Sequence, residues 1–441
     1  MWQRIFPKIL TSGWSVFVLA LLIRWGVFYY HYFIYKTPGG IPPSPHANEV
    51  YDLLAQSLLN GQGLTLWYFA YRPPLYSMFI AVVYSLFNTT NPLSAVFAQS
   101  FISAAICPLA YRLAKELGAT AKVQWLAALL TALDPASITI NLVLMAETLS
   151  NLFIALTLIF LVRLLKGGQW RDIAASAASA TLAALARPNA IYFFAVVALI
   201  IVIGLPHKRI WAALFVCLFG LGVAPWYLRN YAYAHVATFA TTSDFNLLFY
   251  KGVSVEQWAT GKSPASIQAE FTYELERRLG LSRPRNSYDE NSMWSYLVPN
   301  DTRAYRLMRE MALEVYRAHP LTYVLLIPVT LLKLLGFNGF PDLRDPLTNI
   351  TWIYNIGLYS LSSVGCLSGL KKKSWLWLTI TLMSIVYFLL VPALTGGVQD
   401  TRARANVTIC FAILAAEGIE RLRVWRPHFS RFHASNHLPR P

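Results

Sequence analysis

The chain has few charged residues. Only 13% of its 441 residues are Asp, Glu, Lys or Arg, whereas a soluble domain carries about 25%. Hydrophobic residues make up 56% of the sequence, and the mean hydropathy is +0.45. This composition excludes a soluble globular protein and predicts a polytopic membrane protein with one large polar insertion.

Cysteine is also sparse. The four cysteines all lie within apolar runs, and none is spaced as in a metal-binding motif: Cys107, Cys217, Cys366 and Cys410. We therefore expect neither a disulfide framework nor a cysteine metal site. Lys and Arg outnumber Asp and Glu by 37 to 21. In a membrane protein this surplus reflects cytoplasmic loops and anionic lipid, and no nucleic-acid-binding module is visible.

Long apolar runs are what the chain has in abundance. A helix that crosses a bilayer needs about 20 apolar residues. The runs predict an all-α polytopic bundle of about 10–12 transmembrane helices, with the clearest candidates near 14–35, 93–114, 121–134, 137–163, 172–186, 189–206, 209–227, 349–369, 374–392 and 404–418. Two further apolar segments, 73–87 and 320–336, begin at prolines and carry aromatic residues. They are predicted to lie at the interface or to re-enter the membrane.

The Lys and Arg clusters between these runs fit a single topology with both chain ends in the cytoplasm. That topology places the first loop, the long polar segment and a late hairpin (391–404) together on the extracytoplasmic side. The predicted organisation has four parts: an N-terminal transmembrane module with a catalytic first outer loop (1–227, loop 36–92), a long extracytoplasmic segment with interfacial helices and a small subdomain (228–348), C-terminal transmembrane helices (349–418) and a basic cytoplasmic tail (419–441).

The first outer loop holds the densest group of polar candidates. Glu49 and Asp52 flank Tyr51 just before an amphipathic stretch that ends at Gly61. A carboxylate at a membrane surface can act as a general base for an acceptor hydroxyl or amine. Either acid can instead cap the helix that follows, where the macrodipole favours negative charge. His46 lies beside this turn, but one His and one Glu make a poor metal site, so no metal is expected.

The order of short motifs along the chain carries a family resemblance. An acid is followed by Tyr51, Ala55, Leu58, Gly61 and Gly63, and then by Arg72-Pro73-Pro74-Leu75-Tyr76. This pattern resembles the GT-C glycosyltransferases, most closely the branch of protein O-mannosyltransferases and aminoarabinose transferases. Further segments resemble the same branch: LMAETL (144–149), ALARPNA (184–190), APWYLRNY (224–231) and the late Arg402-x-Arg404. The likeness extends from about residue 10 to residue 420.

The resemblance implies a GT-C-like bundle that takes a sugar from a polyprenyl-phosphate donor outside the cytoplasm. The family's catalytic aspartate lies about four residues before the motif tyrosine, where this chain has Ala47, followed by Asn48 and Glu49. We take Glu49 as its substitute, and an inactive relative remains an alternative. The substrate pocket would be lined by a small polar and aromatic set: His46, Asn48, Tyr51 and Tyr76.

Ionisable residues inside the apolar runs form a second set of candidates, because burying a charge in a membrane costs roughly 2.5–3.5 kcal/mol on insertion scales. Glu147 is either a further catalytic acid or the ion-pair partner of Arg24 or Arg187. Asp134 precedes Pro135 and is predicted to cap a helix. Arg24 lies near the middle of the first span, and we predict a structural ion pair for it.

Arginines on the outer side could bind the leaving group. A polyprenyl phosphate gains negative charge as the sugar–phosphate bond breaks, and a guanidinium can hold it with two hydrogen bonds. The outward candidates are Arg72, Arg187, Arg229, Arg402 and Arg404. Each could instead anchor the protein at the membrane interface.

The leading interpretation is a membrane glycosyltransferase that moves a sugar from a polyprenyl-phosphate donor to a lipid, glycan or protein acceptor, with Glu49 as general base. No cofactor is expected, because the donor arrives activated. The alternatives are a polymerase or ligase of lipid-linked glycans, a glycolipid transporter or flippase, and a non-catalytic assembly partner. The polar candidates cluster on one side, which favours surface chemistry over transport. The expected location is a bacterial-type inner membrane, with the site facing outward.

Overall fold

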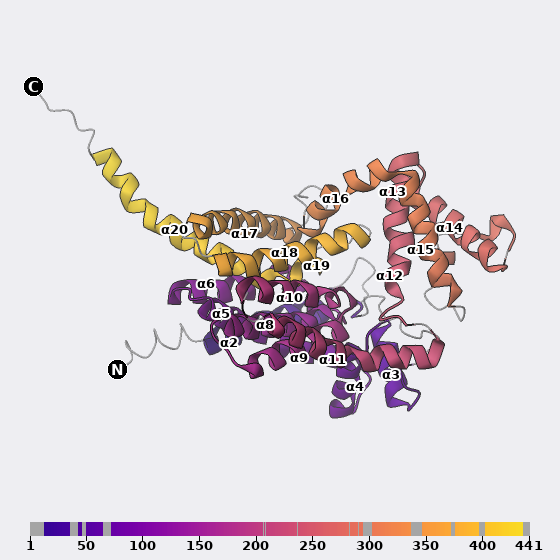
Figure 1. Cartoon of the computed structure of the whole chain (residues 1–441), viewed down its shortest axis with the longest axis horizontal. Coiled ribbons are helices and arrows are strands. Elements are labelled where there is room, and N and C mark those ends of the chain that lie inside the picture. Colours follow the sequence, from indigo (N-terminus) through magenta and orange to yellow (C-terminus); the bar gives the residue numbers. More distant parts are fainter. Residues whose placement is uncertain are drawn as a thin grey trace, which may run out of the picture.

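The computed structural model describes residues 13–35, 43–45, 50–64, 72–205, 207, 209–235, 237–281, 283–289, 291–293, 302–336, 346–371, 375–396 and 402–434. Within these ranges the regular secondary structure is helical, and turns and irregular segments connect the helices without any strand. The predicted all-α class is therefore confirmed. Figure 1 shows the arrangement of the helices.

The helices follow the predicted apolar runs in order. Their bounds are α2 (Gly13–Tyr29), α3 (Tyr51–Leu59), α4 (Leu75–Phe87), α5 (Pro92–Glu116), α6 (Ala121–Ala132), α7 (Pro135–Ile140), α8 (Glu147–Leu165), α9 (Trp170–Ala186), α10 (Phe193–Gly204), α11 (Ile210–Ala234), α12 (Thr242–Phe245), α13 (Val253–Thr260), α14 (Pro264–Leu279), α15 (Arg303–Ala318), α16 (Pro320–Leu334), α17 (Pro346–Lys371), α18 (Trp375–Thr395), α19 (Arg402–Ala405) and α20 (Thr408–Ala434). Two π-helical segments, η1 (Tyr30–Ile34) and η4 (Asn246–Gly252), and two 3-10 turns, η2 (Pro188–Ala190) and η5 (Arg285–Ser287), complete the order.

Five of the described helices are long and apolar enough to cross a membrane on their own: Gly13–Ile34, Pro92–Glu116, Glu147–Leu165, Ile210–Tyr233 and Trp375–Thr395. A sixth span is possible if the bent pair α15 and α16 is counted as one. The chain is thus an integral membrane protein. Several of the other predicted spans are short or interrupted helices. For this reason, fewer helices than the 10–12 predicted are long and apolar enough to cross a membrane on their own.

The predicted span 137–163 is not continuous, and the sequence-based expectation was wrong there. Helix α7 ends at Ile140, and α8 begins only at Glu147. The side-chain amide of Gln99 donates to the carbonyls of Asn141 and Val143, at 2.8 and 2.7 Å. The break persists inside the bundle because a neighbouring helix satisfies backbone groups that water cannot reach.

Both segments expected at the interface are short helices that begin at prolines. Pro74 is the N-cap of α4, and Pro320 is the first residue of α16. Proline is favoured there because the first helical turn needs no amide donor. Helix α16 leaves α15 at an angle of 101°.

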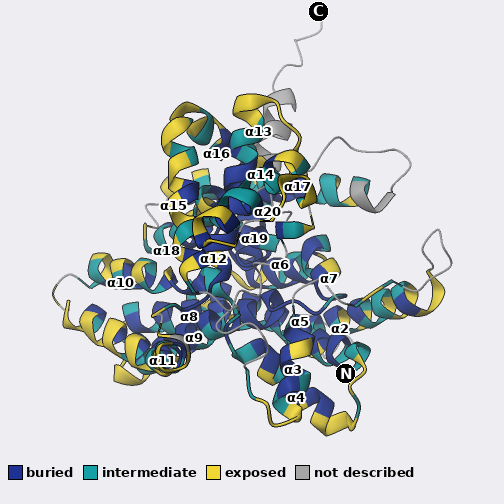
Figure 2. Cartoon of the chain, turned by 90° about the vertical axis from the view of Figure 1, so that its right-hand side faces the viewer, coloured by how far each residue is buried: buried dark blue, intermediate teal, exposed yellow. Residues whose placement is uncertain are grey.

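The helices form three groups in Figure 1. Helices α2 to α11 make one group, and the C-terminal helices α17 to α20 lie against it. The segment α12 to α16 projects from one end and has a hydrophobic cluster of its own, which includes Phe249, Leu275 and Met308. The main core runs between the first two groups, and Figure 2 shows it as a continuous buried interior. This interior fixes the ends of the helices that carry the site.

Two glycines allow a close contact between α17 and α20. A Cβ atom on Gly365 of α17 would lie 1.9 Å from the carbonyl oxygen of Leu414 in α20. A Cβ atom on Gly418 of α20 would lie 2.1 Å from the carbonyl oxygen of Leu361 in α17. Small residues allow such close backbone approach between membrane helices. The two helices are therefore packed backbone to backbone.

Replacing Gly365 by alanine should lower the stability of the protein. The added methyl group must push α17 and α20 apart, and overpacking of this kind costs about 2 kcal/mol or more. The thermal unfolding midpoint of the purified protein in detergent measures the loss. Gly357→Ala in the same helix is the matched control, because nothing lies within 4 Å of its Cβ position. An equal midpoint for the two variants would contradict the close contact.

Candidate active site

The first outer loop is anchored by an aromatic cluster. The rings of Tyr51 and Tyr76 meet edge to face, with centroids 4.9 Å apart, and both side chains are buried. The Tyr76 hydroxyl donates to Oε1 of Gln99 at 2.6 Å. The guanidinium of Arg72 lies 5.5 Å from the centre of the Tyr51 ring. These contacts bring Tyr51, Tyr76 and Arg72 together.

Asp52 lies in the first turn of α3 and is 8% exposed. Its Oδ1 accepts a hydrogen bond from the Tyr84 hydroxyl, and its Oδ2 accepts one from Nε2 of Gln56 at 3.0 Å. The carboxylate thus joins α3 to α4. This geometry suits a structural acid at a helix N-terminus better than a mobile base.

Glu49, His46 and Asn48 lie outside the described residues, but both of their flanks are placed. The Pro45 carbonyl accepts a hydrogen bond from the Leu144 amide at 2.9 Å. Val50 packs against the hydrophobic cluster of the α12–α16 segment. Val50 also has a φ of 25°, which is a strained conformation for a β-branched residue. Strain of this kind concentrates at functional sites, and here it falls directly after Glu49.

Glu147 and Arg187 form an ion pair. Arg187 Nη2 lies 3.0 Å from Glu147 Oε1, and the two side chains are 14% and 3% exposed. Glu147 is the first residue of α8, where a carboxylate is favoured by the helix dipole. Arg187 is extended because Pro188 follows it and ends α9. Nη1 of Arg187 also approaches Oδ1 of Asn406 at 3.4 Å. Of the two alternatives for Glu147, the ion pair with Arg187 is therefore present.

A second ion pair is buried completely. Arg404 Nη2 donates to Asp134 Oδ1 at 2.6 Å, and neither side chain is exposed. Asp134 Oδ2 accepts from the backbone and hydroxyl of Ser137 and from the Thr408 hydroxyl. Asp134 is the N-cap of α7, so the predicted capping role is confirmed. The pair holds α19 against the end of α6 and places Arg404 in the interior.

Arg229 and Arg402 lie outside these two ion pairs. Arg229 Nη2 donates to the Leu64 carbonyl at 2.6 Å, and its guanidinium lies over the rings of Trp226 and Tyr233. Arg229 thus fastens the end of the first loop to α11. Arg402 begins α19 and is partly exposed.

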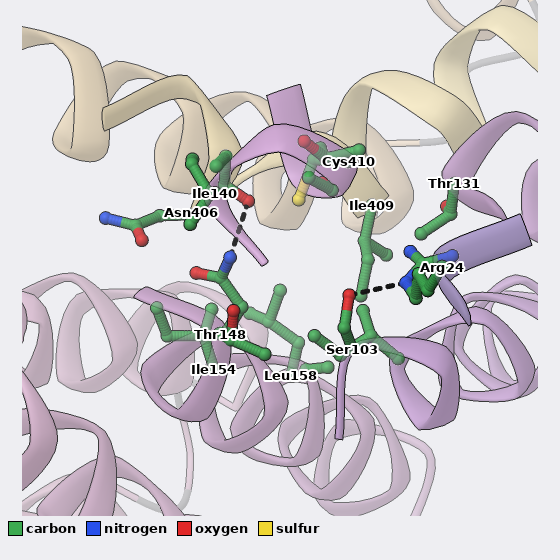
Figure 3. Close-up of a pocket in the computed structure, with 16 residues that line it drawn as sticks. Arg24, Ser103, Thr131, Ile140, Thr148, Ile154, Leu158, Asn406, Ile409 and Cys410 are labelled. Carbon is green, nitrogen blue, oxygen red and sulfur yellow. Dashed lines mark hydrogen bonds between the residues drawn. The ribbon is translucent and has the colours of Figure 1, made fainter. Parts of the chain in front are cut away.

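Arg24 does not form the predicted ion pair with any described residue. Its Nε donates to the Ser103 hydroxyl at 2.6 Å, and its Nη1 donates to the carbonyls of Ala20 and Ala132. It lines a small cavity that Asn406 lines at the opposite end (Figure 3). The cavity can hold water but has no room for a sugar. The Ser103 hydroxyl and the two backbone carbonyls take the place of the expected acid.

No group of three or more His, Cys, Asp or Glu side chains that could hold a metal ion occurs among the residues placed in the structure. The chemistry that the described residues can support is instead that of charged groups at fixed positions. Arg187 is a partly exposed cation, and the chain on either side of Glu49 is held in place. A guanidinium at a fixed, partly exposed position can stabilise a leaving anion.

Comparison with known proteins identifies the fold. Residues 71–228 match the dolichyl-phosphate-mannose-protein mannosyltransferase family. The structure superimposes on the oligosaccharyltransferase AglB from Archaeoglobus fulgidus, determined with an inhibitory peptide and a dolichol-phosphate, at a TM-score of 0.54 and 14% identity over 97% of this chain. The apo form of that oligosaccharyltransferase superimposes at a TM-score of 0.53 and 15% identity over 97% of this chain. The fold is that of the GT-C glycosyltransferases. The predicted resemblance is thereby confirmed.

The GT-C match has defined limits. This chain spans about half the length of AglB, 52% and 53% in the two structures. ArnT from Cupriavidus metallidurans, bound to undecaprenyl phosphate, gives a TM-score of 0.40 at 14% identity, over 93% of this chain and 78% of ArnT. No curated protein sequence matches the chain.

Sequence reasoning missed the Asp134–Arg404 pair and the role of Asn406. The two charged residues are 270 positions apart, and Asp134 has a sufficient local explanation as a helix cap. The signal that could have found the pair is the requirement that an arginine inside an apolar bundle have a partner.

The Asp134–Arg404 pair gives a stability prediction. Arg404→Met leaves Asp134 buried without its cation, which should cost about 3–5 kcal/mol. Adding Asp134→Asn should recover much of this loss, because neither remaining group is charged. The measurement is a double-mutant cycle of unfolding midpoints in detergent. As a control, Arg112→Met removes an arginine that is 44% exposed and should change stability by less than about 1 kcal/mol. Additive losses in the cycle would argue against the coupling.

Proposed function

We propose that this GT-C protein is a glycosyltransferase that moves a sugar from a polyprenyl-phosphate donor to a lipid, glycan or protein acceptor. The observation that carries the proposal is the position of the described residues on either side of Glu49. Pro45, on one flank, is hydrogen-bonded to Leu144, three residues before Glu147. Val50, on the other flank, packs against the α12–α16 segment. One flank thus lies beside the chain that leads to the Glu147–Arg187 ion pair, and the other lies beside the α12–α16 segment.

The comparisons support the donor class. The matching family is named for transfer from dolichyl-phosphate-mannose, and the AglB structure holds a dolichol-phosphate. The topology derived from the basic clusters supports a site on the extracytoplasmic side of a bacterial-type inner membrane. We propose no metal or nucleotide cofactor, since the sugar–phosphate bond of the donor already supplies the leaving group.

In the proposed reaction Glu49 accepts the proton of the acceptor hydroxyl or amine as its lone pair attacks the anomeric carbon. The bond between that carbon and the phosphate oxygen breaks, and its electron pair stays on the phosphate. One displacement of this kind inverts the anomeric configuration. Glu147 keeps Arg187 in place through their ion pair. Tyr51 and Tyr76 shape the wall behind the sugar.

The arginines then divide into two groups. Arg187, Arg72 and Arg402 are the proposed phosphate ligands, because each retains some exposed surface. Arg404 is fully buried against Asp134, and Arg229 binds the Leu64 carbonyl. We assign these two to holding α19 and the first loop in place. A guanidinium near the phosphate lowers the barrier by stabilising the charge that develops there.

Release of polyprenyl phosphate from a panel of polyprenyl-phosphate sugars tests the function, with purified protein and native lipid extract as the acceptor source. Glu49→Gln removes the base and should lower the rate by 10²-fold or more, roughly the contribution of a general base. The control is Glu310→Gln on the exposed face of α15, which should leave the rate unchanged.

Two results would change this assignment. Full activity in Glu49→Gln would keep the transferase and move the base to Asp52 or Glu147. The absence of polyprenyl phosphate release with every donor, in preparations that are folded, would contradict the proposed activity and favour transport or assembly.

A further inference from the structure

Arg24 is a buried cation that the proposed reaction does not use. It lies in α2 and is 1% exposed. A guanidinium has five N–H donors and is not deprotonated in proteins. Nε and Nη1 of Arg24 donate to the Ser103 hydroxyl and to the carbonyls of Ala20 and Ala132. These acceptors carry no net charge, and no described residue accepts a hydrogen bond from Nη2.

The acids around Arg24 are paired with other cations. Asp134 pairs with Arg404, and Glu147 pairs with Arg187. The remaining acids on the described helices that line the Arg24 cavity also have basic partners: Glu116 with Arg112 and Arg163, Glu417 with Arg421, and Glu420 with Lys122. Among the residues placed in this part of the interior, Arg24 is therefore a positive charge without a counter-ion.

The cavity beside Arg24 offers further hydrogen-bond donors. Its lining includes five hydroxyl side chains: Ser103, Thr131, Ser137, Thr148 and Thr408. Three of them already donate, Thr131 to a backbone carbonyl and Ser137 and Thr408 to Asp134. The hydroxyls of Ser103 and Thr148 donate to no described residue, and Figure 3 shows Ser103 directly against Arg24. Both hydroxyl protons are thus available to a ligand in the cavity.

The size of the cavity restricts the ligand. Its volume is about 20 Å³, which is enough for one or two particles of the size of a water molecule. Phosphate, sulfate and carboxylate ions each have several non-hydrogen atoms and do not fit. A halide ion is a single atom and is only slightly larger than water.

Charge decides between a halide and a water molecule. Water can accept hydrogen bonds from Arg24, but it leaves the charge of the guanidinium uncompensated. A charge buried in a low-dielectric interior is costly unless it is both paired and hydrogen-bonded. A halide supplies the missing negative charge and requires only donors around it, and hydrogen bonds from a guanidinium to an anion are among the strong ones.

We propose that the cavity between Arg24 and Asn406 is a halide site that holds chloride, with the ion accepting hydrogen bonds from the Arg24 guanidinium and from the hydroxyls of Ser103 and Thr148. The ion joins α2, α5 and α8 inside the bundle, because each of these helices contributes one of the three donors. The site is independent of the proposed glycosyl transfer and serves the stability of the folded chain.

The thermal unfolding midpoint of the full chain in detergent tests the site. Potassium chloride replaces potassium gluconate at constant ionic strength, since gluconate is too large for the cavity. An anion that binds only the folded state raises the midpoint as its concentration passes the dissociation constant. The midpoint should rise by about 2 °C and then level off. Bromide should give a similar plateau, and sulfate should give none.

Two variants and a control locate the effect. Arg24→Met removes the cation and should abolish the response to chloride. Thr131→Asp places a carboxylate in the cavity, next to the Ala132 carbonyl that Arg24 contacts. It should also abolish the response, and it carries the test if Arg24→Met does not fold. The control is Arg112→Met, which removes an arginine that is 44% exposed and should respond to chloride like the wild type.

Equilibrium dialysis against radioactive chloride counts the bound ions. Wild type should bind about one chloride per chain with saturation, as a cavity of this size allows, and Arg24→Met should bind none there. Equal chloride responses in wild type and both cavity variants would place the effect elsewhere and overturn the site. A wild-type protein that neither responds to chloride nor binds it would show that the cavity holds water only. Both results leave the transferase proposal standing, because release of polyprenyl phosphate tests that separately.

Discussion

The need to satisfy backbone polar groups inside a membrane determines this structure. Three helix breaks lie within the bundle: 141–146, 187–192 and the turn at 406–407. A side chain from another helix closes each one. Gln99 of α5 binds the first, Tyr387 of α18 donates to the Asn189 carbonyl in the second, and Asn151 of α8 donates to the Ala405 carbonyl beside the third. Unsatisfied groups there would cost several kcal/mol each.

These breaks also bring an acid, an arginine and an asparagine into contact. Glu147 follows the first break, Arg187 begins the second, and Asn406 forms the third while contacting Arg187. If the helices were continuous, these three side chains would lie at other positions along the helix axes and would not meet. The candidate site is therefore a consequence of interrupted helices. The Asp134–Arg404 pair serves the same end, because it fixes α19 just before the third break.

Much of the fold follows from the sequence, because each apolar run is a local property. The starts of α4 and α16 were predictable from prolines, and the cap at Asp134 from the Pro135 that follows it. The break inside 137–163 was not predictable, since the side chain that permits it, Gln99, belongs to another helix. Neighbouring residues favour a helix there, and tertiary contacts override them.

The candidate site was predictable only in part, because its contacts also join residues that are distant in sequence. The Glu147–Arg187 ion pair was one of two alternatives for Glu147, and the structure contains it. Arg24 forms no ion pair with a described residue, because the Ser103 hydroxyl and two backbone carbonyls accept its hydrogen bonds.

The glycine contact between α17 and α20 has a consequence for biogenesis. Helix α20 packs against α6 as well as against α17, and the Gly365–Gly418 crossing requires both backbones to be in place. The face of α6 that α20 covers therefore stays uncovered until α20 has been synthesised. The described helices can enter the bilayer one by one, but this part of the interior closes only when α20 packs against them.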